Sequence, residues 1–174
     1  STNLLSNGSF EDATLSPWSA SHVDHIGSLW DASDLNKSID LNSSESGTIS
    51  QSFTTYSGGT YAVHFDMSGN NRGCGEPDPD IKELYASAGT AVDLSFTFDA
   101  AGINTSLTAM GWLPKSFNFV ATGTSTTLTF ASQVGGYCGP ALDNIRVNFL
   151  SHFLQQGSNT WVVTPEFSDD DVAS

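Results

Sequence analysis

The fold is organised around a late segment with the pattern of a half-buried β-strand, Ala141-Leu142-Asp143-Asn144-Ile145-Arg146-Val147-Asn148-Phe149-Leu150. Ile145, Val147 and Phe149 lie at every second position, which places them on one face of a strand. The natural partner of this strand is at the other end of the chain, in Asn7-Gly8-Ser9-Phe10-Glu11. We therefore expect the two ends of the domain to meet.

The rest of the chain repeats the same strand pattern at short intervals. Alternating apolar and polar segments, separated by Gly, Ser, Asn and Pro, occur at residues 23–26, 38–41, 48–53, 61–67, 81–88, 92–98, 117–121 and 127–131. No segment has a sustained apolar repeat of 3.6 residues, so no helix is predicted. This pattern predicts an all-β fold, an antiparallel β-sandwich over residues 1–150.

The net charge of the chain limits the classes of partner that it can bind. The chain has 174 residues with Lys+Arg 5 against Asp+Glu 19, a net charge of −14. Such a chain repels phosphate backbones, so nucleic acid is excluded as a partner, whereas hard cations prefer oxygen ligands. The alternative is that most of the acids merely keep a secreted protein soluble. No apolar run is long enough to insert in a membrane, and the first residues do not form a signal peptide.

The two cysteines, Cys74 and Cys138, are each followed by glycine. No second pair of ligands lies near them, so a zinc site is not predicted. We favour one disulfide over two free thiols. A disulfide that closes so long a loop would stabilise the fold by roughly 4 kcal/mol on the chain-entropy model. A structural disulfide in turn indicates an oxidising compartment.

Several segments resemble known families. The opening Asn-Leu-Leu-Ser-Asn-Gly-Ser-Phe-Glu, the Pro17-Trp18 pair and Ala-Leu-Asp-Asn-Ile-Arg-Val resemble galactose-binding-like jelly rolls, common among carbohydrate-binding modules. A closer resemblance is to the bacterial choice-of-anchor C proteins and the related plant cell-wall family of unknown function. The segments that carry it are Val-Asp-His-Ile-Gly (23–27), Ser-Ile-Asp-Leu (38–41), Thr-Ile-Ser-Gln-Ser-Phe (48–53), Gly-Trp (111–112), Thr-Thr-Leu-Thr-Phe (126–130) and Cys-Gly-Pro-Ala-Leu-Asp-Asn (138–144).

The resemblance, over residues 3–150, implies a structural calcium ion. In such modules the acid after Phe and the late Asp bind it with backbone carbonyls, which implies these roles for Glu11 and Asp143. Carbonyls near residues 36–38 are expected to complete the site. The family usually has glycine after Asp34, whereas this chain has Leu35. The alternative is that both carboxylates only accept hydrogen bonds.

The resemblance also implies sugar binding. A sugar site needs aromatic rings that stack on C–H faces and polar groups for the hydroxyls. The candidate sugar-binding residues are Trp18, Trp30, His64, Arg72, Trp112 and Tyr137. The alternative for each tryptophan is a place in the core.

Catalysis is not predicted. The chain has neither a Gly-x-Ser-x-Gly elbow nor a His-Glu-x-x-His motif. No spacing marks a pair of acids for glycoside hydrolysis. The acidic run at residues 76–80 is interpreted as a solvated loop, with a second calcium site as the alternative.

The C-terminal extension, residues 151–174, is surplus to the sandwich, with a strand expected at about 159–167. Trp161, Val163 and Phe167 share one face of that strand, which therefore needs a surface to cover it. We expect an exported, non-catalytic structural subunit of an extracellular filament or surface layer, self-associating through this strand. The alternative is a stand-alone carbohydrate-binding module of the cell surface that binds polysaccharide.

Overall fold

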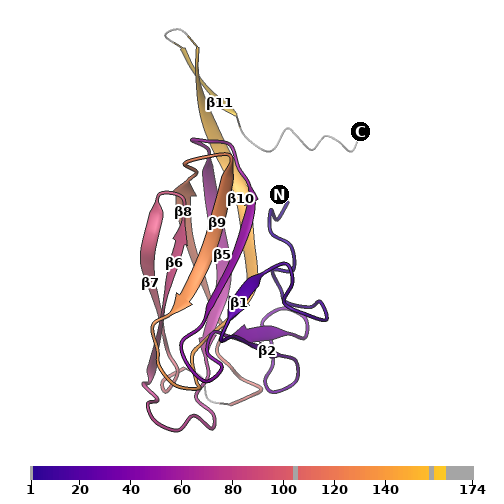
Figure 1. Cartoon of the computed structure of the whole chain (residues 1–174), viewed down its shortest axis with the longest axis vertical. Coiled ribbons are helices and arrows are strands. Elements are labelled where there is room, and N and C mark those ends of the chain that lie inside the picture. Colours follow the sequence, from indigo (N-terminus) through magenta and orange to yellow (C-terminus); the bar gives the residue numbers. More distant parts are fainter. Residues whose placement is uncertain (1, 104–105, 157–158, 164–174) are drawn as a thin grey trace.

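The computed structural model describes residues 2–103, 106–156 and 159–163, which form two antiparallel sheets packed face to face (Figure 1). No helix occurs in these ranges, so the predicted antiparallel β-sandwich is confirmed, and nothing in them is a helix able to span a membrane. The first sheet has the spatial order β1 (Ser19–Ser21), β4 (Thr48–Thr54), β9 (Ser125–Ser132), β6 (Ile81–Ala88) and β7 (Ala91–Asp99). The second has the order β2 (Asp24–Ile26), β3 (Ser38–Asp40), β10 (Pro140–Gln156), β5 (Thr60–Gly69) and β8 (Leu113–Val120).

The core lies between the sheets and follows the alternation in the sequence. On β5, Tyr61, Val63, Phe65 and Met67 are buried on the inner face. Phe65 meets Phe130 of the opposite sheet with ring centroids 5.0 Å apart. Each such side chain stabilises the fold by roughly 1.5–3 kcal/mol through burial.

The N-terminal segment lies along β10, as the sequence predicts. The N–H of Leu4 donates to the carbonyl of Val147 at 2.8 Å, and the N–H of Ile145 donates to the carbonyl of Gly8 at 2.9 Å. A Cβ at residue 8 would stand 2.1 Å from the Ile145 carbonyl oxygen, so only glycine fits there. This close approach brings Glu11 to the end of the chain that carries Asp143.

β10 runs further than expected. From the sequence we expect the chain to leave the sandwich after residue 150 and to continue as a linker. Instead, β10 continues to Gln156 and pairs there with β11 (Asn159–Val163). Residues 152–156 of β10 and β11 form a two-stranded hairpin, the arm, which projects from one end of the sandwich (Figure 1). In its register Trp161 pairs with Leu154 and Val163 with His152; Phe167 lies outside the described residues.

Candidate functional site

Asp143 holds one side of the loop that spans residues 33–37, the 33–37 loop. Its Oδ2 accepts the N–H of Ser33 at 2.9 Å, the N–H of Asp34 at 2.8 Å and the hydroxyl of Ser33 at 3.2 Å. Its Oδ1 accepts the N–H of Asn144 at 2.7 Å. A bulge at Asn144, which has a φ of 53°, interrupts the pairing of β10 with β5 immediately after Asp143. The Asp143 side chain is fully buried beneath the loop.

Glu11 holds the other side of the same loop. Its Oε1 accepts the N–H of Asn36 at 2.8 Å and the N–H of Lys37 at 2.6 Å. Leu35 stands between the two sets of bonds with a φ of 59° and 71% of its surface exposed. The backbone therefore keeps the left-handed conformation that glycine would favour, although the residue is leucine.

The burial of Asp143 disfavours the charged form of its carboxyl group. Burial raises the pKa of Asp143 to about 7, against the opposing effect of its hydrogen bonds. A buried carboxylate gains from a bound cation, and the ligand atoms that Glu11 and Asp143 carry are oxygens, the type that calcium takes. The chemistry of these two residues would therefore suit a calcium ion.

A different group of possible ligands is closed to metals. This group consists of Cys74, Asp78 and Cys138. Both of its sulfur atoms belong to a disulfide, and Asp78 Oδ1 forms an ion pair with Lys82 Nζ at 2.7 Å. The acidic run at residues 76–80 therefore contributes one carboxylate to a structural pair. This favours the reading of that run as a loop.

The disulfide itself is as predicted, with 5.3 Å between the Cα atoms of Cys74 and Cys138. It joins two irregular loops, residues 70–80 and 133–139, which we call the rim. The loops also touch directly, since a Cβ at Gly136 would lie 2.8 Å from the carbonyl oxygen of Pro77. Tyr137 stands on this rim with 60% of its surface exposed, and Arg72 on the rim is also exposed.

Beneath the rim lies a buried carboxylate that sequence reasoning missed. Asp40 Oδ1 accepts the N–H groups of Asn42 at 2.9 Å and Gly139 at 3.1 Å, and its Oδ2 accepts Nδ2 of Asn70 at 2.8 Å. Burial raises the pKa of Asp40 to about 7. The Asn42 amide in turn donates to the carbonyl of Gly136 at 2.8 Å. The rim loops are thus tied to β3 by polar contacts.

Lys82 ties the rim to β6. Its side chain is fully buried, and Nζ donates to Asp78 Oδ1 at 2.7 Å and to the carbonyl of Cys138 at 3.1 Å. The sequence contained a signal, because Lys82 falls on the same alternating face as Leu84 and Ala86. A charged residue at an inward position is costly unless it is paired, so this position pointed to a buried partner.

Two of the predicted sugar-stacking residues belong to the interior. Trp18 is buried against Phe10, with ring centroids 5.8 Å apart. Trp30 is buried in a second cluster with Met110 and Ala141 on the outer side of the second sheet. Neither ring face is open to solvent, so both assignments as stacking platforms are corrected to core positions.

The remaining candidates do not converge on one pocket. Trp112 is half-buried at the edge of that second cluster, and its Nε1 donates to the carbonyl of Asp31 at 2.9 Å. His64 is half-buried on β5, where the register sets it opposite Arg146 of β10 and Ser116 of β8. Arg72 and Tyr137 share the rim, away from this strand register.

Most of the chain that carries this loop and the rim matches a family model. Residues 12–148 match the model described as protein of unknown function, DUF642. The chain belongs to the DUF642 family. It is also 29% identical over 169 residues to halomucin of Haloquadratum walsbyi; the match covers 83% of this chain but only 2% of that protein.

Solved structures similar to this DUF642 domain include carbohydrate-binding modules with the jelly-roll fold. A family 61 module in complex with β-1,4-galactotriose has a TM-score of 0.60 at 19% identity, covering 86% of this chain and 99% of that one. The xylan-binding CBM22-1 domain of Xyn10C from Paenibacillus barcinonensis has a TM-score of 0.54 at 17% identity, covering 85% and 94%. A family 35 module from Clostridium thermocellum has a TM-score of 0.54 at 11% identity, covering 75% and 90%. At these identities the likeness establishes the fold.

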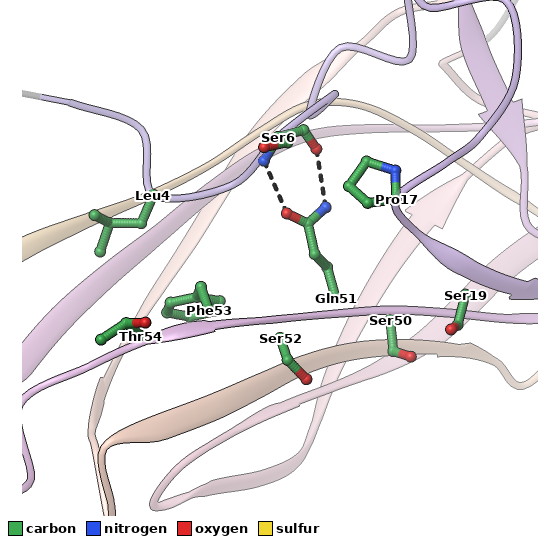
Figure 2. Close-up of a pocket in the computed structure, with 9 residues that line it drawn as sticks. All are labelled: Leu4, Ser6, Pro17, Ser19, Ser50, Gln51, Ser52, Phe53 and Thr54. Carbon is green, nitrogen blue, oxygen red and sulfur yellow. Dashed lines mark hydrogen bonds between the residues drawn. The ribbon is translucent and has the colours of Figure 1, made fainter.

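The DUF642 domain also has a groove that the sequence did not predict. It has a volume of about 630 Å³ and lies between the N-terminal segment and β4 (Figure 2). Its lining is mixed, with hydroxyls, one amide and three apolar side chains, from Leu4, Ser6, Pro17, Ser19, Ser50, Gln51, Ser52, Phe53 and Thr54. The volume is within the roughly 300–1,000 Å³ of typical ligand sites.

Proposed function

We propose that this domain is an exported, non-catalytic carbohydrate-binding module whose sugar contact is made at the rim. The observation that carries the proposal is Tyr137, an aromatic ring 60% exposed on a loop that a disulfide holds in place. An exposed, rigidly held aromatic face stacks on the C–H face of a sugar ring with little loss of conformational freedom. The fold shared with carbohydrate-binding modules supports this reading.

Arg72 supplies polar chemistry near that ring. It is exposed on the same rim, and a guanidinium is a type of donor group that binds sugar hydroxyls or a sugar carboxylate. The polar contacts of Asp40 and Lys82 below the rim keep the two loops from moving apart. His64 and Trp112 would serve a separate contact on the second sheet.

Calcium is the second element of the proposal. Glu11 and Asp143 would bind one ion together with carbonyls near residues 36–38, by the fit of their oxygens to this cation. The bound ion would offset the charge of two neighbouring carboxylates and so stabilise the 33–37 loop. Calcium has a structural role here, and no step of a reaction passes through it.

The test of sugar binding is a comparison of two tyrosines. The wild type is screened on a panel of plant and bacterial polysaccharides, and its best ligand is titrated calorimetrically. We expect Tyr137→Ala to lose at least tenfold in affinity. Tyr56→Ala is the control, since Tyr56 is 59% exposed but lies in the β4–β5 loop. No binding to any glycan, or equal losses in both variants, would count against the rim.

A second candidate function is assembly, with this chain as a structural subunit joined through its C-terminal strand. The observation that favours it is the arm, which leaves the sandwich instead of packing on it (Figure 1). Phe153 on the arm is 61% exposed. An isolated two-stranded ribbon is marginally stable in water, so the arm gains from a partner strand.

A further inference from the structure

We propose that the groove beside β4 receives the arm of a second copy, so that β11 of one copy adds a strand to the first sheet of another. This inference rests on the assembly candidate above and names the acceptor surface that it requires. Four observations carry it: an open strand edge, a gap beside that edge, the absence of charge and proline on it, and an arm whose strand β11 pairs, within the described ranges, with β10 alone.

The edge of β4 is open over residues 51–54. β1 pairs with β4 only from Thr48 to Ser50. In the ladder with β9, the N–H of Ser132 donates to the carbonyl of Gly47 at 2.9 Å, so odd-numbered residues of β4 bond to β9. Even-numbered residues face the other way. Ser52 and Thr54 therefore present their peptide N–H and C=O groups to the groove.

A side chain keeps the opposite wall of the groove at a distance. The amide of Gln51 accepts the N–H of Ser6 at 2.8 Å and donates to the carbonyl of Ser6 at 2.9 Å, as Figure 2 shows. The N-terminal segment thus bonds to a side chain of β4 and not to its backbone at this point. Leu4 and Phe53 add apolar surface on the two sides, which suits a strand with alternating polar and apolar residues.

The edge strands β2, β7 and β8 carry the residues that natural sheets use against unwanted pairing, which are charges and proline. β7 has Asp93 and Asp99, β8 has Pro114 and Lys115, and β2 has Asp24. Residues 51–54 of β4 and residues 159–163 of β11 contain neither a charge nor a proline. In a chain of net charge −14, these two uncharged segments can approach each other without strong repulsion.

The donor and the acceptor are also of matched length. β11 has five residues, and the open part of β4 spans residues 51–54. The occupant we propose is a second copy, because the chain itself supplies an uncharged strand of matching length on the arm. Since donor and acceptor are different surfaces of one chain, the contact is head-to-tail, and its repetition builds a filament unless the rotation between copies closes a ring.

The experiment blocks each surface separately and measures mass by sedimentation over a range of protein concentrations. Ser52→Pro removes an N–H that faces the groove and leaves the β9 ladder intact, and its melting is checked first. Thr97→Pro is the matched control. The 2.8 Å bond from the N–H of Ala100 to the carbonyl of Asp80 sets even-numbered residues of β7 against β6, so Thr97 also faces outward from an edge.

We expect the full chain and Thr97→Pro to form species above the monomer mass, and Ser52→Pro to remain a monomer. A chain without residues 157–174 keeps the acceptor and lacks the donor, so it is also expected to be a monomer. Mixing it with Ser52→Pro should give a one-to-one heterodimer that grows no further. If Ser52→Pro assembles like the full chain, the assignment of β4 as the acceptor edge is wrong, while assembly through the arm still stands. A full chain that stays monomeric would overturn assembly as well, whereas sugar binding is tested independently on the monomer.

Discussion

Glu11 and Asp143 accept hydrogen bonds from the two sides of one short loop, with Leu35 alone between the two sets of amides. Asp143 takes the N–H groups of Ser33 and Asp34, and Glu11 takes those of Asn36 and Lys37. Residues near both ends of the domain thus shape the same loop. Because one of these carboxylates is fully buried, the stability of this junction is expected to depend on cations and on pH.

Calcium is expected to stabilise the folded domain. A ligand that binds only the folded state adds about 2.7 kcal/mol at a concentration 100 times its Kd. Thermal melts after chelator dialysis should therefore shift upward when calcium is restored, and Glu11→Gln and Asp143→Asn should lose this shift. Asp40→Asn, which alters a buried acid away from the 33–37 loop, should retain it. Identical melts with calcium and with chelator would contradict the site.

Leu35→Gly is expected to stabilise the domain in chemical denaturation by up to about 1 kcal/mol. The left-handed conformation costs a residue with a side chain roughly 1–2 kcal/mol, part of which is offset by the greater backbone entropy of unfolded glycine. Leu29→Gly is the control, since Leu29 is also exposed but does not have a positive φ. Leu29→Gly should have a lower free energy of unfolding than the wild type. A loss in Leu35→Gly as large as in the control would argue against strain at this residue.

Stability should fall as the pH rises from about 4 to about 7, because of the raised pKa of Asp40. Between the ordinary value of 3.8 and the folded value of about 7, the folded state keeps a proton that the unfolded state releases. This contribution is therefore fully present below pH 4 and is lost as the pH rises to 7. Burial raises the pKa of Asp143 to about 7 as well, which adds a slope of the same sign, so Asp40→Asn should reduce the slope of unfolding free energy against pH without removing it. A slope in Asp40→Asn equal to that of the wild type would contradict the contribution of Asp40.

Deletion of residues 157–174 should leave a folded domain that no longer assembles. Among the residues that the structure describes, the buried core and the hydrophobic residues packed against it end at Phe149, so the deletion leaves this part of the core complete. The melting temperature is expected to change by only a few degrees, since within the described ranges the lost strand β11 pairs with residues 152–156 of β10 alone. Unfolding of the shortened chain would instead show that the extension belongs to the stability of its own sandwich.

Much of the fold could be predicted because strand alternation is local. The inward side chains Val63 and Phe65, the meeting of the N-terminal segment with Ile145 and the Cys74–Cys138 disulfide all agree with the sequence pattern or with its family resemblance. The calcium assignment of Glu11 and Asp143 stays a prediction. Its geometry, two carboxylates on one loop, became visible only in the structure.

Which residues alternate and which segments are strands could be read from the sequence alone, since both follow from the two-residue period of a strand. Only the tertiary structure decided that Trp18 and Trp30 are interior and Tyr137 is exposed, because a tryptophan has the same local pattern in a core and on a surface. The open edge at Ser52 was likewise invisible, since an edge depends on where the short β1 stops beside β4. Such features depend on which strands become neighbours, and that is a property of the folded chain and not of any single segment.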